Sequence, residues 1–310
     1  MQSAREVLES FELSNLPDLD VAVIGALELL SESKLPTLNP NHRQYLVIGS
    51  VNALSTGKII FNNRNAIFAS ESNYLKIIEQ NPKLEGVVLV SASGGKHAIE
   101  IAKNIEEKGL DLTLLTNNPN APAKEFLSEK NIIVFPKNRE PYTYNTSTYL
   151  SMILASTGEN PKQILSLIES AVKPKLLRNF GDYNAVVIIV PPRFELVKDM
   201  FRTKFDELFG PRIVGRVFTS EEIKHAKTVV SSGDELFIGL GVHNEDFGLT
   251  QNRINISLSA ESSYGEVLAV GYYLIGQIQK SHPPYFKNSL EEYTNKISKI
   301  FNQDIKPIVE

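Results

Sequence analysis

LVSASGGKH, residues 89–97, joins a predicted strand to a predicted helix. The apolar run of residues 86–93 indicates a buried strand, and residues 97–109 indicate a helix that stops at a glycine. The two serines and two glycines between them would present hydroxyls and backbone N–H groups at the positive end of the helix. Lys96 adds a point charge that suits phosphate. We therefore predict an anion site here, with the alternative that the serines only cap the helix.

This loop differs from the two common nucleotide-binding loops. The sequence has no G-x-x-x-x-G-K-[ST] motif, since STGK at residues 55–58 lacks the upstream glycine. It has no G-x-G-x-x-G motif either. The predicted anion loop is therefore neither a Walker loop nor a Rossmann dinucleotide loop.

Strands and helices alternate on both sides of the loop. Apolar runs predict strands at residues 44–50, 66–70, 112–118, 131–135, 185–190, 213–218, 235–242 and 253–259. Helical stretches are predicted at residues 20–33, 53–62, 121–130, 140–155, 161–178, 194–209, 221–227 and 262–279. Strands that alternate with helices are typical of βαβ units and parallel sheets, so the predicted fold class is α/β.

The pattern divides the chain into two halves of a typical domain size. Turn residues around 158–161 mark the weakest point between them. We expect an N-terminal helical segment at residues 1–43, a first α/β domain at 44–160, and a second domain with the C-terminal tail at 161–310.

Composition excludes several classes of function. The 310 residues include 32 Lys and Arg against 36 Asp and Glu, a net charge of −4, which argues against a general nucleic-acid binder. The absence of cysteine excludes disulfides, thiolate metal sites and cysteine nucleophiles. The five histidines show no helical spacing typical of zinc ligands, so no metal site is predicted; they are His42, His97, His225, His243 and His282.

The sequence shows no targeting signal. The first 20 residues are acidic and lack the basic and apolar regions of a signal peptide. No segment reaches about 20 apolar residues without charge, so we expect no membrane span. A cytoplasmic location is the expectation.

Several motifs resemble, in the right order, those of the SIS (sugar isomerase) domain family, above all the isomerase half of glucosamine-6-phosphate synthase. In the first half they are Gly49-Ser50 with residues 57–61, Ala69-Ser70-Glu71, Ser91-Ala92-Ser93-Gly94, Leu115-Thr116-Asn117, and Glu140 followed by Thr146. In the second half, residues 204–207 and 222–225 are similar to the family's Lys-x-Lys-Glu and Glu-Leu-Lys-His. The resemblance covers about residues 44 to 270. It implies two SIS-type three-layer αβα domains with parallel sheets.

The resemblance also implies a site. In the family a 6-phosphosugar binds between the two halves and the dimer partners, with its phosphate on the hydroxyl loop. Glu207 matches the carboxylate that moves a proton between C1 and C2 through an enediol, and His225 matches the histidine that helps to open the sugar ring. The family requires no cofactor or metal ion, and a homodimer is expected. The candidate phosphate and substrate contacts are Ser50, Ser91, Ser93, Gly94, Lys96, Glu140 and Thr146.

The catalytic candidates have plainer interpretations. Glu207 and His225 lie in polar stretches, where side chains are usually solvated. His243 competes with His225, because it follows a strand, where the ligands of α/β proteins gather. His97 lies beside the predicted phosphate loop and would either contact an anion or simply start the helix.

The sequence also departs from the family pattern. Lys96 and Ala98 replace a threonine and a glutamate, Val51 replaces the second hydroxyl of the first loop, and Ser147 replaces a lysine. Pro191-Pro192-Arg193 replaces Gly-Arg-Gly. These changes are compatible with a different substrate, or with a protein that binds a sugar phosphate without converting it.

The C-terminal tail, residues 304–310, has two interpretations. In aminosugar-forming relatives the tail carries a Schiff-base lysine and ends near Val-Glu. Lys306 matches either that lysine or an earlier Asp-Lys-Pro stretch of the same tail. A Schiff-base lysine has to be desolvated to be nucleophilic near pH 7.

The leading functional hypothesis is a phosphosugar isomerase that interconverts an aldose and a ketose, or a related deaminase or deglycase. Its substrate would be a 6-phosphosugar or an aminosugar phosphate. The second hypothesis is a non-catalytic SIS protein that binds a sugar phosphate for regulation. Such regulators usually carry a DNA-binding domain, and residues 1–43 are too short and acidic for one. A third is an α/β protein that binds another anionic metabolite at the same loop.

Overall fold

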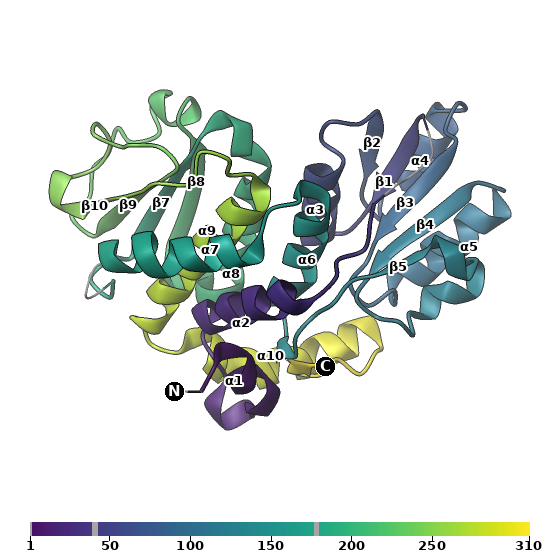
Figure 1. Ribbon diagram of the computed structural model, residues 1–310, viewed down its shortest axis with the longest axis horizontal. Coiled ribbons are helices and arrows are strands. Elements are labelled where there is room, and N and C mark those ends of the chain that lie inside the picture. Colours follow the sequence, from purple (N-terminus) through teal and green to yellow (C-terminus); the bar gives the residue numbers. More distant parts are fainter. Residues whose placement is uncertain (1, 39–42, 177–179) are drawn as a thin grey trace. The chain divides into compact units, whose positions relative to one another are not determined.

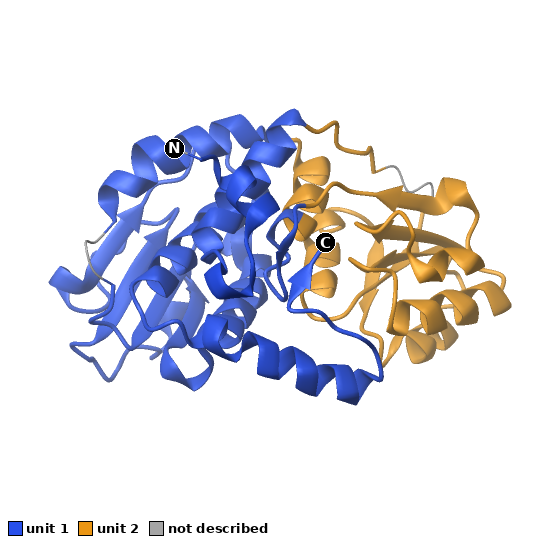
Figure 2. Cartoon of the chain, turned by 90° about the horizontal axis from the view of Figure 1, so that it is seen from below, with its two compact units in different colours: residues 1–32, 138–147, 159–310 blue, residues 33–137, 148–158 orange. Residues whose placement is uncertain are grey.

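The computed structural model describes residues 2–38, 43–176 and 180–310, so that His42 lies outside the described residues. The chain forms two compact units, which Figure 2 shows in blue and orange. Unit 1 consists of Met1–Glu32, Asn138–Ser147 and Glu159–Glu310, and unit 2 of Ser33–Lys137 and Thr148–Gly158.

Unit 2 contains a five-stranded parallel sheet with the order β2-β1-β3-β4-β5 (Figure 1). Its strands are β1 (Tyr45–Ile48), β2 (Ala66–Ala69), β3 (Gly86–Val90), β4 (Asp111–Thr116) and β5 (Ile132–Val134). Strands β1 and β3 are buried along their whole length. Continuous apolar runs of this kind are expected where a parallel sheet is covered on both faces.

Helices cover both faces of this sheet. Strand residues such as Leu46 and Val87 pack with α4 and α5 in one apolar cluster, and α3 and α6 lie on the other face (Figure 1). Gly57 allows α3 to approach the sheet, because a Cβ there would lie 2.7 Å from Val47 Cγ1. The helices are α3 (Asn52–Ile60), α4 (Tyr74–Gln80), α5 (His97–Glu107) and α6 (Thr146–Thr157), whose first two residues belong to unit 1.

Unit 1 contains a four-stranded parallel sheet with the order β10-β9-β7-β8. Its strands are β7 (Ala185–Val190), β8 (Val214–Thr219), β9 (Glu235–Leu240) and β10 (Arg253–Ile256). Helix α8 packs against β8 through Phe205, whose ring lies over Gly215; a Cβ there would lie 2.1 Å from the ring. The helices are α1 (Ala4–Ser10), α2 (Leu19–Glu32), α7 (Pro161–Leu167), α8 (Lys198–Phe209), α9 (Tyr264–Lys280) and α10 (Tyr285–Phe301).

The C-terminal tail forms a small antiparallel sheet in unit 1. Strand β11 (Ile308–Val309) pairs with β6 (Glu140–Pro141). The Tyr142 backbone N–H donates to the Pro307 carbonyl at 2.8 Å and extends this pairing. Residues more than 160 positions apart are thereby joined.

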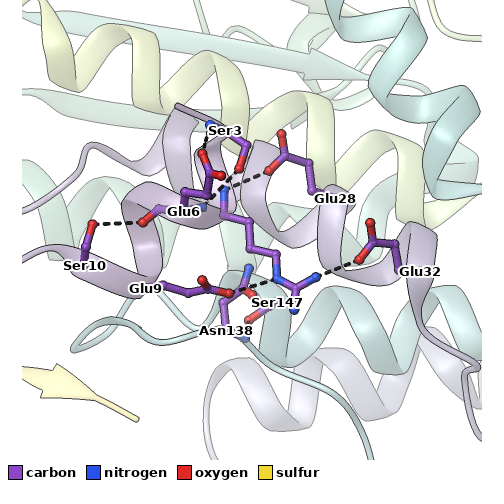
Figure 3. A network of polar contacts seen from close by, with 9 residues as sticks. Ser3, Glu6, Glu9, Ser10, Glu28, Glu32, Asn138 and Ser147 are labelled. Atoms are coloured by element: carbon purple, nitrogen blue, oxygen red, sulfur yellow. Dashed lines mark hydrogen bonds and ion pairs between the residues drawn. The ribbon is translucent and has the colours of Figure 1, made fainter. Parts of the chain in front are cut away.

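The N-terminal segment is an integral part of unit 1. Ser3 and Glu6 form a reciprocal capping box at the start of α1 (Figure 3). Arg5 joins α1 to α2 through its backbone N–H to Glu28 and its guanidinium to Glu32, both at 2.8 Å. Helix α2 in turn packs closely on α9, since a Cβ at Gly276 would lie 2.1 Å from the Asp20 nitrogen. The predicted domain limits at 43/44 and 160/161 stay a prediction.

The predicted fold class is confirmed: both units are α/β with parallel sheets, in SIS-like αβα layers. The nine predicted strands, residues 86–93 included, correspond to β1–β5 and β7–β10. The sequence pattern does not predict α4, α10 or the β6–β11 pair. It predicts one helix at residues 140–155, which the structure divides into a strand, a turn and α6. No helix in the described part of the chain has the length and apolar character that a membrane crossing needs.

Candidate functional site

The sheet of unit 2 has a topological switch point between β1 and β3. The chain leaves β1 for β2 on one side, whereas β3, β4 and β5 follow on the other. In open parallel sheets, ligands bind outside the carboxyl ends of the strands at such a point. The loops after β1 (residues 49–51) and β3 (residues 91–96) meet this edge, and each leads directly into a helix N-terminus.

Both loops end in the same strained backbone conformation. Val51 precedes α3 with φ 44° and ψ −110°, and Lys96 precedes α5 with φ 50° and ψ −126°. Residues other than glycine rarely adopt positive φ, and a β-branched residue such as valine hardly ever does. Strain of this kind costs about 1–3 kcal/mol for each residue and gathers at functional sites. Because both loops contain a strained residue, the carboxyl edge of β1 and β3 is the candidate functional site of unit 2.

The serines of the second loop shape its backbone. Ser91 Oγ accepts the Gly94 N–H, and Ser93 Oγ accepts the Gly95 N–H, each at 3.2 Å. Because a hydroxyl that accepts one hydrogen bond keeps its own proton, both side chains retain a donor for an anion. These bonds shape the turn that precedes α5, which begins at His97. The serines thus bond to the glycines of their own loop and do not cap the helix.

The end of β4 holds the loop in place. The Ala92 carbonyl accepts the Asn117 backbone N–H at 3.0 Å and the Thr116 hydroxyl at 2.9 Å. The Ser93 carbonyl accepts the Asn118 side-chain amide at 3.0 Å. A loop fixed in advance loses less entropy when a ligand binds.

Lys96 and Ser50 complete the candidate anion site. Partial burial lowers the pKa of the Lys96 ammonium, since desolvation disfavours its charge. A bound anion would restore the stability of that charge. Ser50 is half-buried at the end of β1, and its carbonyl accepts the Ala53 N–H at 2.9 Å at the start of α3.

We predict that Gly94→Ala disrupts this loop more than Gly109→Ala does. Both glycines have positive φ, 62° and 67°, so the strain of about 1–2 kcal/mol is shared. At Gly94 a Cβ would also lie 2.4 Å from the Ala121 Cβ, whereas nothing lies within 4 Å at Gly109. Denaturant unfolding should therefore show an extra loss of about 1–3 kcal/mol for Gly94→Ala. Equal losses for the two variants would contradict the tight packing of the loop.

In unit 1, Glu207 is paired with a buried lysine. Lys204 Nζ donates to Glu207 Oε2 at 2.6 Å and to the carbonyls of Thr143 and Tyr144 at 2.8 and 2.9 Å. The Lys204 side chain has no exposed surface, and that of Glu207 is 20% exposed. Burial raises the pKa of the Glu207 carboxyl, although the Lys204 charge opposes the shift. Lys204 opens the motif of residues 204–207 but was given no role from the sequence; its i, i+3 spacing from Glu207 was the available signal.

Glu207 opens on a cavity of about 630 Å³. Its walls are the end of α8, the turn Gly210–Arg212 and the first half of α10. Tyr285 and Tyr293 supply aromatic surface, and Asp206 and Arg212 supply charge. The predicted base candidate therefore has room for a ligand beside it, within unit 1.

Two further residues of unit 1, Thr143 and Tyr142, line the cavity beside Glu207 or interact with the Glu207 charge. Thr143, which lines the cavity, has φ 76°, an unusual value for a β-branched residue. The pKa of Tyr142 is raised by burial and by the charges of Tyr293 and Glu207. Sequence analysis missed both residues, because neither strain nor burial can be read from their types.

Glu140 and Thr146 contact each other at the start of α6. The buried Glu140 carboxylate accepts the backbone N–H groups of Thr146 and Ser147 at 2.6 and 2.7 Å, and the Ser147 hydroxyl at 2.5 Å. It thus satisfies the first N–H groups of α6. Burial raises the pKa of Glu140 despite these bonds. Their contact with a substrate stays a prediction.

His225 and Lys306 are both solvent-exposed. His225 follows the 3₁₀ turn Glu222–Lys224 and is not among the described residues that line the cavity beside Glu207. The Lys306 side chain is 68% exposed, and its Nζ pairs with Asp304 at 2.7 Å. The surroundings of Lys306 do not provide the desolvation that a Schiff-base lysine needs.

His97 and His243 also lie at the surface. His97 is exposed at the first position of α5. His243 is 70% exposed and contacts Glu245 at 3.1 Å. Across the described residues, no group of three or more His, Asp or Glu side chains is arranged to hold a metal ion.

Comparison with solved structures identifies relatives of the fold. The C-terminal domain of glucosamine-fructose-6-phosphate aminotransferase from Francisella tularensis matches with a TM-score of 0.61 and 11% identity, over 90% of this chain and 99% of that one. Glucosamine-6-phosphate deaminase from Thermotoga maritima matches with a TM-score of 0.61 and 14% identity, over 86% and 95%. No protein-family model and no curated protein matches the sequence. The similarity at this identity is one of fold.

Proposed function

We propose that this chain binds a phosphorylated sugar at the edge of β1 and β3 and isomerises it between aldose and ketose. The observation that carries the proposal is the switch point itself, where two strained loops lead into adjacent helix N-termini. The hydroxyls of Ser91 and Ser93 and the charge of Lys96 suit a phosphate group. The fold relatives named above act on glucosamine phosphate or fructose phosphate by name, which agrees with this substrate class.

Glu207 is the proposed base. In the open-chain sugar its carboxylate would take the proton from C2 of the aldose and return it to C1 of the enediol, while a proton passes from O2 to O1. A catalytic base works best when its pKa lies near the working pH, and burial moves the pKa of Glu207 in that direction. Lys204 holds the carboxylate in position.

The rate of isomerisation should rise with pH as Glu207 ionises. Because burial raises its pKa above the ordinary 4.5, we expect the acid limb of kcat/KM to lie above pH 4.5. The charge of Asp206 contributes to this increase, so Asp206→Asn should move the limb to lower pH. A pH–rate profile of both proteins tests this. A limb that Asp206→Asn leaves in place would argue against Glu207 as the titrating base.

A second candidate function is binding without conversion. The exposure of His225 favours it, because this histidine is the proposed ring-opening group and does not line the described cavity beside Glu207. The homodimer stays a prediction; in relatives such a histidine can come from the neighbouring subunit. The cytoplasmic location and the lack of nucleic-acid binding also stay predictions. The proposed substrate is either a 6-phosphosugar or an aminosugar phosphate.

A thermal-shift screen of fructose, glucose, mannose and glucosamine 6-phosphates tests the proposal. A ligand at 100 times its Kd should stabilise the protein by about 2.7 kcal/mol. The shift that depends on the sugar should disappear in the double variant Ser91→Ala/Ser93→Ala. It should persist in Ser128→Ala, an exposed serine of the same unit. The absence of any sugar-dependent shift would refute the phosphosugar proposal.

A further inference from the structure

The two parallel sheets share one strand order. The order β2-β1-β3-β4 in unit 2 matches β8-β7-β9-β10 in unit 1, with the strands following one another along the chain in the same sequence. The switch point between β1 and β3 therefore has a counterpart between β7 and β9. The loop of residues 241–248 after β9 corresponds to the serine loop, and the proposed function makes no use of it.

A cavity of about 200 Å³ lies at this second edge. Its walls come from Arg193 after β7, from residues 241–243 after β9, and from residues 255–259 at the end of β10. The lining is therefore contributed by the carboxyl ends of three parallel strands, which is where open parallel sheets bind ligands.

The guanidinium of Arg193 is held in place at this edge. It lies over the Phe194 ring, 4.6 Å from the centroid, and one N–H donates to Ser262 Oγ at 3.2 Å. The Arg193 carbonyl accepts the Tyr264 hydroxyl at 2.8 Å, which anchors the backbone as well. Guanidinium groups present several donors in a planar fork that fits phosphate oxygens.

Hydrogen bonds of Asn244 and Asn255 hold the loop after β9 together. Asn255 Oδ1 accepts the Asn244 backbone N–H at 2.8 Å, and the Asn244 side chain exchanges two hydrogen bonds with the Phe247 backbone. Gly239 makes the first of these bonds possible, since a Cβ there would lie 2.4 Å from Asn255 Oδ1. The cavity wall is thus formed before any ligand arrives.

Arg193 supplies the positive charge of the cavity lining. Arg193 and His243 are the ionisable groups of its described lining. Two acidic groups contact that lining, and both have partners: Glu245 pairs with His243, and Glu266 accepts the backbone N–H and hydroxyl of Ser259. We propose that this cavity is a second anion site, at which Arg193 and the Ser257 hydroxyl bind the phosphate group of a small molecule.

Equilibrium dialysis of the full chain with radiolabelled inorganic phosphate tests the proposal. In the Ser91→Ala/Ser93→Ala background, which disables the first candidate site, one phosphate should still bind for each chain. Adding Arg193→Gln should raise the Kd at least tenfold, and so should Ser257→Asp, which places a negative charge in the cavity. Arg202→Gln, which removes the same charge from an exposed arginine of the same unit, should leave the Kd unchanged.

A parallel titration with glucose 6-phosphate identifies the form of the ligand. A cavity of this size would hold little more than the phosphate, so the ester and the free anion should bind with similar Kd in the serine background. Phosphate binding that neither Arg193→Gln nor Ser257→Asp weakens would overturn the second site, as would the absence of binding in that background. Either result would leave the phosphosugar proposal untouched, because that proposal depends on the serine loop of unit 2.

Discussion

Glu207→Gln should lower kcat for isomerisation by about 10²–10⁴-fold, the usual contribution of a catalytic base. The amide cannot take the C2 proton, but its oxygen can still accept a hydrogen bond from Lys204 Nζ. In the unmodified protein this bond to the Glu207 carboxylate measures 2.6 Å. The affinity for the phosphosugar should therefore persist, although the loss of the counter-charge of Lys204 should lower the free energy of unfolding. Turnover and thermal shift, both measured with the sugar that gives the largest shift, separate these two effects.

The matched control is Glu221→Gln, a glutamate of the same unit that is 65% exposed and pairs with Lys224. It should change neither turnover nor binding. If Glu207→Gln kept kcat within a factor of a few, the base would be another group. If neither protein turned over any phosphosugar that binds, the non-catalytic function would be supported instead.

Lys204→Met should cost about 3–5 kcal/mol of unfolding free energy, because it removes one partner of a buried ion pair. The ammonium has no exposed surface and serves three acceptors, the Glu207 carboxylate and the carbonyls of Thr143 and Tyr144. Methionine fills similar space but donates no hydrogen bond, so all three acceptors would lose their donor. Denaturant unfolding with linear extrapolation measures the loss.

Two further variants show whether the ion pair causes that loss. The double variant Lys204→Met/Glu207→Gln should lose less than Lys204→Met alone, since no unpaired carboxylate remains. Lys198→Met, on the same helix, breaks an ion pair with the more exposed Glu222 and should cost about 1 kcal/mol or less. Equal losses for Lys198→Met and Lys204→Met would show that burial does not strengthen the Lys204 pair.

The fold could be predicted largely because its information is local. The runs at residues 86–90 and 185–190 are apolar throughout. A short apolar run beside turn residues is typical of a strand that is buried on both faces of a parallel sheet. Helix α10 was missed although its pattern is amphipathic, and the β6–β11 pair was missed because two-residue strands have no periodicity. Pairing between residues 140–141 and 308–309 depends on distant parts of the chain.

The candidate site could be predicted only in part. The hydroxyls, glycines and lysine of residues 91–96 indicated an anion loop before its geometry was known. The positive φ of Val51 and Lys96 could not be foreseen, because neither residue type favours that conformation. For Glu140, the motif predicts a substrate contact, which stays a prediction. What the motif did not indicate is that the carboxylate accepts hydrogen bonds from the first residues of α6.

The sequence by itself determined the α/β class, the strands of the two parallel sheets and the position of the candidate anion loop, since periodicity and turn chemistry act over a few neighbouring residues. Only the tertiary structure decided that Lys204 is buried, that the pKa of Glu207 is raised, and that α10 closes a cavity beside it. Burial and desolvation depend on which distant segments pack against a side chain. The same holds for the second switch point, because strand order arises from pairing across the whole sheet.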